Sequence, residues 1–171
     1  MRPTNEQIKG WIEEYLATGY GDAVKKRAWK GQYIRSHAPW NNAEDCYHEW
    51  LKCINDKEKE LSRSVSFEEL YNAVQLLKIK GIGDLTIYDT ATMLGCPIGI
   101  YPEAVYLHAG AAVGAAVIGI EGDIVEKSVF EKAYSAFKLL EPIQIEDFLC
   151  IYKKLLAGEV VESPHGCVRC C

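Results

Sequence analysis

The feature of this sequence that most constrains its fold is a short turn, Gly81-Ile82-Gly83, which joins two segments of helical periodicity. The first segment opens at Ser66, and the second runs from about Asp84 to Leu94. Glycine has no Cβ, so it reaches positive φ without steric penalty and lets another backbone come close. The second helix then begins with N–H groups that point out of the turn, where they can hold a phosphate. The sequence therefore predicts a tight helical hairpin with an anion-binding end.

The rest of the chain also shows helical periodicity, and no segment of useful length alternates with the period of two that strands show. Further helices are predicted from Thr4 to Gly19 and over residues 22–36, 43–61, 124–140 and 145–156. The sequence thus predicts an all-α fold of about eight helices. A single globular domain is expected over residues 1–160, with the hairpin at about 66–95, followed by a cysteine-rich tail over residues 161–171.

The longest apolar run extends from Ala104 to Ile120. It is shorter than the roughly 20 residues that a membrane span needs, and His108 interrupts it, so we expect a buried helix and no membrane partner. Pro102 suits the first turn of such a helix, because its missing N–H would be unpaired there in any case. The spacing Gly110-x-x-x-Gly114, set among alanines, should let a neighbouring helix approach closely.

The composition describes a soluble globular protein, with 49% hydrophobic and 25% charged residues. The formal charge of −5 argues against a surface that binds nucleic acid everywhere, although a local basic patch can still do so. Seven cysteines, an odd number, do not form a secreted disulfide framework, and no apolar signal core follows the N-terminus. We therefore expect a cytoplasmic, reducing environment.

The order apolar-x-Gly-apolar-Gly over residues 79–83 resembles the helix-hairpin-helix motif. Together with a small-residue helix in an all-α chain, the stretch from about Ser66 to Ile118 resembles the helix-hairpin-helix DNA glycosylase superfamily. In that family the hairpin grips the DNA backbone while a base is flipped into a cleft, and the implied process is DNA repair. The resemblance assigns backbone contacts to Lys78, Lys80, Gly81, Ile82, Gly83 and Thr86.

The family's two chemical positions are both altered in this sequence. Bifunctional members carry a lysine two residues past the second hairpin glycine, where this chain has Leu85. The family pattern Val-Asp-Thr-His corresponds to Val105-Tyr106-Leu107-His108, and a tyrosine is neutral at pH 7 and cannot supply a carboxylate's field. When the loop is aligned by length instead, Glu103 becomes the candidate catalytic residue, with Tyr106 and His108 beside it in a pocket.

Three functions remain open from the sequence. The first, which the altered positions favour, is a DNA-binding protein that contacts backbone without sequence specificity and without base excision. The second is a divergent glycosylase that uses Glu103. The third is a protein-interaction module or homodimer formed by the hairpin and the Ala/Gly helix. The acidic composition suits this third function better than it suits DNA binding.

Two further groups of residues could take part. A basic run from Lys25 to Arg35, with Tyr33 and Trp40 for base stacking, could contact phosphate, although a solvated helix face is favoured. Asp84 and Asp89 would instead repel phosphate if they lie at the mouth of the turn.

The tail contains Cys167-x-x-Cys170-Cys171, a spacing that can hold zinc, and some glycosylases carry an iron–sulfur cluster near the C-terminus. With Cys150 the ligand count reaches four, but the spacing is irregular and adjacent cysteines rarely chelate one metal. We therefore expect exposed thiols in a frayed tail, with no metal and no cofactor.

Overall fold

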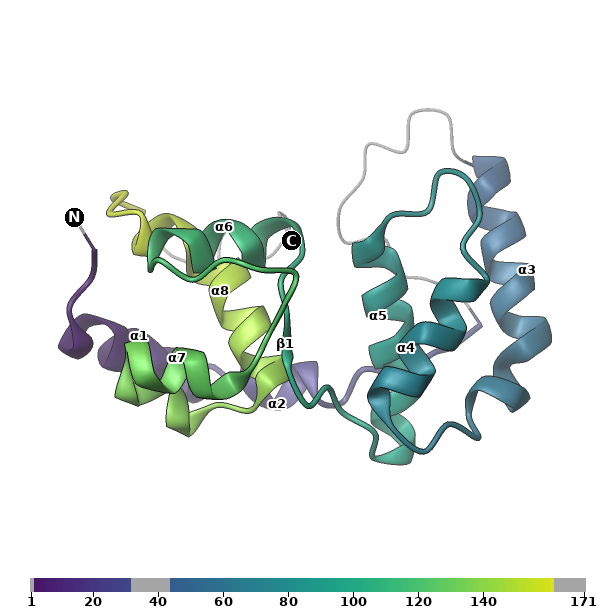
Figure 1. Ribbon diagram of the computed structural model, residues 1–171, viewed down its shortest axis with the longest axis horizontal. Helices are drawn as coiled ribbons and strands as arrows, with labels where there is room; N and C mark the ends of the chain where they lie inside the picture. Colours follow the sequence, from purple (N-terminus) through teal and green to yellow (C-terminus); the bar gives the residue numbers. More distant parts are fainter. Residues whose placement is uncertain (1, 32–43, 162–171) are drawn as a thin grey trace. The chain divides into compact units, whose positions relative to one another are not determined.

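The computed structural model describes residues 2–31 and 44–161, and these residues form two compact units. One unit, the terminal unit, contains the chain up to Lys25 and from Glu103 onward; the other, the inserted unit, is Lys26–Pro102. Each unit is described by itself below, with its elements labelled in Figure 1. The sequence interpretation of one domain over residues 1–160 did not foresee this division.

The described residues contain eight α-helices, and strands are confined to one short pair, so the prediction of a mostly helical fold is confirmed. In the terminal unit the elements are α1 (Asn5–Ala17), α2 (Tyr20–Val24), β1 (Val105–Tyr106), α6 (Ala109–Val117), β2 (Ile124–Val125), α7 (Lys127–Ala133), a 3-10 helix (Ser135–Leu139) and α8 (Pro142–Leu156). In the inserted unit they are α3 (Glu44–Leu61), α4 (Phe67–Leu76), α5 (Asp84–Gly95) and a 3-10 helix (Cys96–Ile98).

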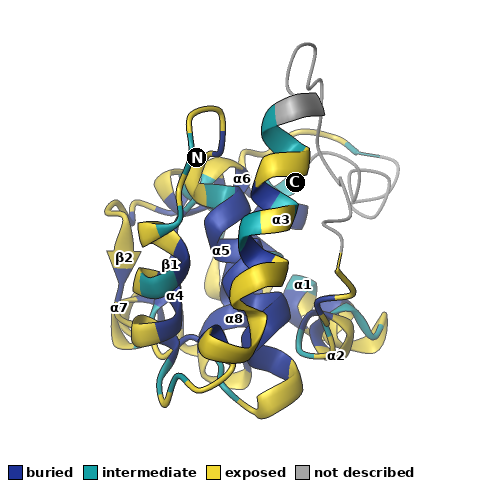
Figure 2. Cartoon of the chain, turned by 90° about the vertical axis from the view of Figure 1, so that its right-hand side faces the viewer, coloured by how far each residue is buried: buried dark blue, intermediate teal, exposed yellow. Residues whose placement is uncertain are grey.

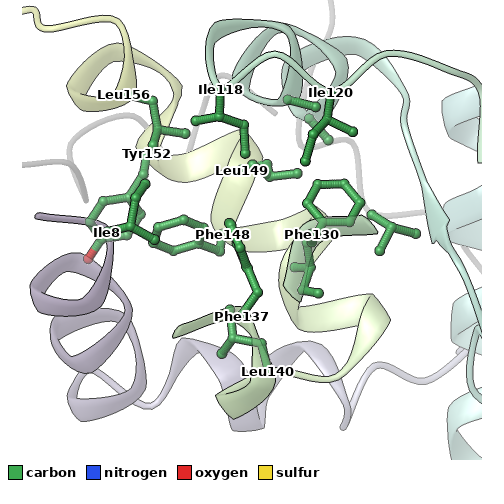
Figure 3. Close-up of a cluster of buried hydrophobic side chains, with 14 of the residues drawn as sticks. Ile8, Ile118, Ile120, Phe130, Phe137, Leu140, Phe148, Leu149, Tyr152 and Leu156 are labelled. Atoms are coloured by element: carbon green, nitrogen blue, oxygen red, sulfur yellow. The ribbon is translucent and has the colours of Figure 1, made fainter. Parts of the chain in front are cut away.

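The terminal unit is built around α8, which is buried along most of its length. A capping box between Glu141 and Gln144 starts this helix. Its rings form an aromatic core: Phe148 stacks on Tyr152 with centroids 4.7 Å apart, and Phe137 meets Phe148 edge-on at 5.9 Å. Figure 3 shows these rings among further apolar side chains from α1, the segment just after α6, α7, the end of the second 3-10 helix and α8: Ile8, Ile118, Ile120, Phe130, Leu140, Leu149 and Leu156.

Helix α6 packs closely on α8 through its glycines, as the sequence predicts. A Cβ added to Gly114 would collide with the backbone carbonyl oxygen of Leu149, and one added to Gly110 would collide with the Sγ of Cys150. Only glycine lets the two backbones approach this closely. The small-residue face that the interaction-module hypothesis offered to another protein is therefore covered by α8 of the same unit.

The segment before α6 is not helical, which corrects the sequence prediction of a helix over the whole apolar run. Val105 and Tyr106 instead pair antiparallel with Val125 and Ile124. Both β1 residues are buried, so the run carries no periodicity by which a strand could be told from a buried helix. β-branched residues at three of the four paired positions favour the strand.

In the inserted unit, α5 is buried from Thr86 to Gly95, whereas α3 exposes much of its surface (Figure 2). Ser66 caps α4 by accepting a hydrogen bond from the Glu69 N–H at 3.2 Å. The helix predicted over residues 22–36 is wrong in its described part, because α2 ends at Val24 and residues 27–30 are irregular. The N–H of Trp29 donates to the carbonyl of Met93 at 2.9 Å. In a continuous helix this N–H would instead donate to the carbonyl four residues earlier.

Across the described ranges, none of the helices has the length and apolar character that crossing a membrane requires.

Candidate nucleic-acid interface

The helical hairpin has the form that the sequence predicts. Residues 77–83 join α4 to α5, with Gly81 at a φ of +96° and Gly83 extended as the N-cap of α5 (Figure 1). Ile82 between them is 3% exposed, and its N–H donates to the carbonyl of Ile79 at 3.1 Å. Ile82 is therefore a buried anchor between two glycines. This anchor fixes the turn against the unit while both glycines stay at the surface.

One side of the turn is backed by α3 and the other side is open. A Cβ built on Gly81 would lie 3.4 Å from the Sγ of Cys46, which is ordinary contact. A Cβ built on Gly83 meets no heavy atom of the described residues within 4 Å, and no side chain of theirs caps α5. With respect to the described residues, the amino end of this 12-residue helix is thus uncovered at Gly83, and its dipole favours an anion there.

The charges at the turn partly oppose one another. Lys80 is exposed and forms no ion pair with any residue that the structure describes. Lys78 is also exposed, but its Nζ lies 2.7 Å from the Oδ1 of Asp84 in the first turn of α5. A phosphate approaching this turn would meet one available cation, one cation held by a carboxylate, and that carboxylate itself.

Thr86, assigned to the backbone contacts from the sequence, does not lie on the open side. It is 6% exposed, and its carbonyl accepts a hydrogen bond from the Thr90 hydroxyl at 2.7 Å. The side chain begins the buried stretch of α5, so it contributes to packing and not to a phosphate-binding surface.

Asp89 lies away from the mouth of the turn, in the buried part of α5. Its carboxylate pairs with Arg27 at 3.1 Å, so the charge that would repel phosphate is neutralised inside the unit. Trp29 likewise points inward, where its Nε1 donates to Asn55 at 2.8 Å. Arg27, in the described part of the basic run, therefore pairs within the inserted unit, and Tyr33 and Trp40 lie outside the described residues.

The residues assigned to chemistry belong to the other unit. Glu103 is exposed on a bend, and the helix whose first turn Pro102 is predicted to occupy does not form there. Tyr106 is buried in β1, and its ring centroid lies 6.2 Å from that of His108, the half-buried N-cap of α6. Glu103, Tyr106 and His108 thus lie in one short segment of the terminal unit, whereas the hairpin residues belong to the inserted unit.

The cysteines give no metal centre in the described part of the chain. No group of three His, Cys, Asp or Glu side chains there could hold a metal ion. Cys46, Cys53 and Cys96 form no disulfide, whereas Cys150 is disulfide-bonded, a state that a reducing compartment would not favour. The Cys-x-x-Cys of the tail lies outside the described residues.

Sequence reasoning missed a groove in the inserted unit. It has a volume of about 300 Å³ and lies between the end of α3 and the length of α4. Its signal in the sequence is Leu76, a leucine off the inward face of α4, which is 87% exposed.

Comparison of the chain with protein-family models, with curated proteins and with solved structures found no match. A functional proposal therefore has to rest on the side chains and amides of this structure.

Proposed function

We propose that the protein binds the phosphate backbone of DNA through the hairpin turn, without sequence readout and without base excision. The observation that carries the proposal is the open amino end of α5, with exposed glycines held in place by the buried Ile82. Backbone N–H groups at a helix N-terminus bind phosphate oxygens, and such contacts position a protein on DNA without reading its bases.

Lys80 supplies the charge for this contact. It stands one residue before Gly81, is exposed, and is not held by a carboxylate in the described part of the chain. The chain carries a net charge of −5, so the rest of its surface repels a polyanion on balance. Binding is therefore confined to this turn, and it is weak and strongly reduced by salt.

The salt dependence provides the test. Fluorescence anisotropy with a labelled 20-base-pair duplex, between 20 and 200 mM KCl, gives the slope of log K against log salt. Each neutralised phosphate adds about 0.9 to the size of that slope, so Lys80→Gln should reduce it by about 0.9. Lys59→Gln is the matched control: an exposed lysine about 20 Å along α3 from Cys46, which backs the turn. Equal slopes for Lys80→Gln and the unsubstituted protein would remove the proposal.

The glycines need separate variants. Gly81 has a positive φ, so Gly81→Ala strains the backbone and tests folding as much as binding. Gly83 has a φ of −90° and open space around its Cβ position, so Gly83→Ala keeps the fold and places a methyl group beside the amides. We expect weaker DNA binding with an unchanged circular dichroism spectrum. Wild-type affinity in this variant would show that the amides do not contact the duplex.

Base excision by Glu103 gains no specific support from the described geometry. Glu103 is exposed on a bend, Tyr106 is buried, and Leu85 has no nucleophilic group. Cleavage of lesion-containing oligonucleotides that is lost in Glu103→Gln would nevertheless show this activity directly.

A further inference from the structure

The groove lies wholly within the inserted unit, between the end of α3 and α4, two helices that run side by side in Figure 1. Its volume of about 300 Å³ is at the lower end of the range for small-molecule sites. The lining side chains come from the last turns of α3, from the connection after it and from α4: Lys57, Glu60, Leu61, Arg63, Ser64, Glu69, Ala73, Leu76 and Leu77.

The apolar part of the groove is incompletely covered. Leu61 is buried beneath it, Ala73 and Leu77 are half-buried, and Leu76 is almost fully exposed at the edge. A ligand with an apolar chain would remove this leucine from water, which favours association.

In the polar part of the groove, both carboxylates have hydrogen-bond partners within the protein, whereas the guanidinium of Arg63 has none among the described residues. Lys57 donates to Glu60 at 2.8 Å, and Glu69 accepts a hydrogen bond from the Val65 N–H at 2.8 Å, so both carboxylates are engaged. The guanidinium of Arg63 makes no ion pair or hydrogen bond with the described residues, although its charge helps Lys57 to lower the pKa of Glu60. Among the charged groups that line the groove, Arg63 is therefore the one with no ion pair or hydrogen bond to the described residues, so all of its donors are available to a ligand.

We propose that this groove binds a small amphiphilic carboxylate. Its short alkyl chain lies against Ala73, Leu76 and Leu77, and its carboxylate accepts hydrogen bonds from the guanidinium of Arg63. Guanidinium matches carboxylate geometry and bonds to it more strongly than neutral donors do. The site uses neither Lys80 nor the two glycines of the turn, so it does not depend on the DNA-binding proposal.

Octanoate is the probe, measured on the full chain by isothermal titration calorimetry. Octanol has the same chain without the charge, and octyltrimethylammonium carries the opposite charge. We expect octanoate to bind in the millimolar range or tighter. Its affinity should exceed that of octanol by about tenfold or more, because a hydrogen bond to a charged group contributes at least about that factor. The octyltrimethylammonium cation should not bind. No octanoate binding at 10 mM, or equal binding of octanol, would overturn the proposal.

Two pairs of variants separate the groove from general stickiness. Arg63→Gln should abolish the preference for octanoate over octanol, whereas Lys59→Gln, on an exposed lysine outside the groove, should keep it. Leu76→Ser should weaken octanoate, whereas Val65→Ser should not, because both side chains are 87% exposed and only Leu76 lines the groove. Equal effects within either pair contradict the site. Lys80→Gln should keep the octanoate affinity of the unsubstituted protein. A failure of the DNA-binding proposal, seen as an unchanged salt slope in this variant, would therefore leave the groove proposal standing.

Discussion

The carboxylate of Asp84 offers the sharpest perturbation of the hairpin. It lies in the first turn of α5 and holds Lys78 at 2.7 Å, and both side chains are largely in solvent. The proposal assigns Asp84 two effects against phosphate binding: it repels the anion and it occupies a lysine. Asp84→Asn removes the charge with little change of shape, so DNA should bind more tightly even though a stabilising interaction is lost.

The loss of stability and the gain in DNA binding caused by Asp84→Asn can be estimated separately. An acidic residue in the first turn of a helix contributes about 0.3–1 kcal/mol through the helix dipole, and an exposed ion pair adds about 0–1 kcal/mol. The free energy of unfolding should therefore fall by roughly 1 kcal/mol. Release of Lys78 adds about one phosphate contact, or about 0.9 in the salt slope. The added contact contributes nothing at 1 M salt. At 0.1 M salt it should therefore make the affinity of Asp84→Asn for DNA roughly eightfold higher than that of the unsubstituted protein.

The assay combines anisotropy titrations at several salt concentrations with urea denaturation followed by circular dichroism. The control is Asp56→Asn, an exposed carboxylate on α3 that changes the net charge by the same amount. Affinity that stays constant or falls in Asp84→Asn refutes the assignment of the turn as a phosphate site. An equal gain in Asp56→Asn would instead attribute the effect to net charge and not to the hairpin.

Two further predictions concern the terminal unit. Gly114→Ala should lower the free energy of unfolding by up to about 2 kcal/mol, because overpacking against α8 costs about 1–3 kcal/mol and helix propensity returns about 1. Gly10→Ala, with open space around its Cβ position in α1, should raise it by up to about 1 kcal/mol in the same urea assay. Burial, and then the charges of Glu14 and Tyr20, raise the pKa of Tyr152 above its usual value. The folded state therefore keeps this proton to higher pH than the unfolded state, so stability is complete below about pH 10 and declines above it. Tyr152→Phe should lose less stability above pH 10 in urea titrations, and an identical decline in both proteins would contradict the assignment.

The features that sequence could predict are those set by neighbours in the chain. The start of the first helix at Thr4, the close-packing glycines of α6 and the hairpin turn depend on residue types at fixed short spacings. A threonine cap and a glycine act through the backbone around them, so their residue type alone indicates their role.

The features that sequence could not predict depend on contacts between distant segments. Arg27 and Asp89 are separated by 62 positions, so nothing local shows that the basic run neutralises a carboxylate in α5. The pairing of β1 with β2 is similar, because an apolar run without periodicity fits a strand or a buried helix equally well. The pairing of Lys78 with Asp84, six positions apart across the turn, could have been anticipated from their opposite charges.

Binding and base excision make different demands on this chain. Phosphate binding needs only the amides of one turn and a nearby cation, and both belong to the inserted unit together with the anchor and the helix that supports them. Base excision also needs a carboxylate whose field is not weakened by water, since a charge in bulk solvent interacts far less strongly than one in a dry site. Glu103 is exposed and Tyr106 carries no charge at neutral pH, so neither meets that demand as the residues stand. The proposed binding of DNA by the hairpin therefore requires no chemistry to follow it, and the salt slope of binding, not an excision assay, is the decisive first measurement.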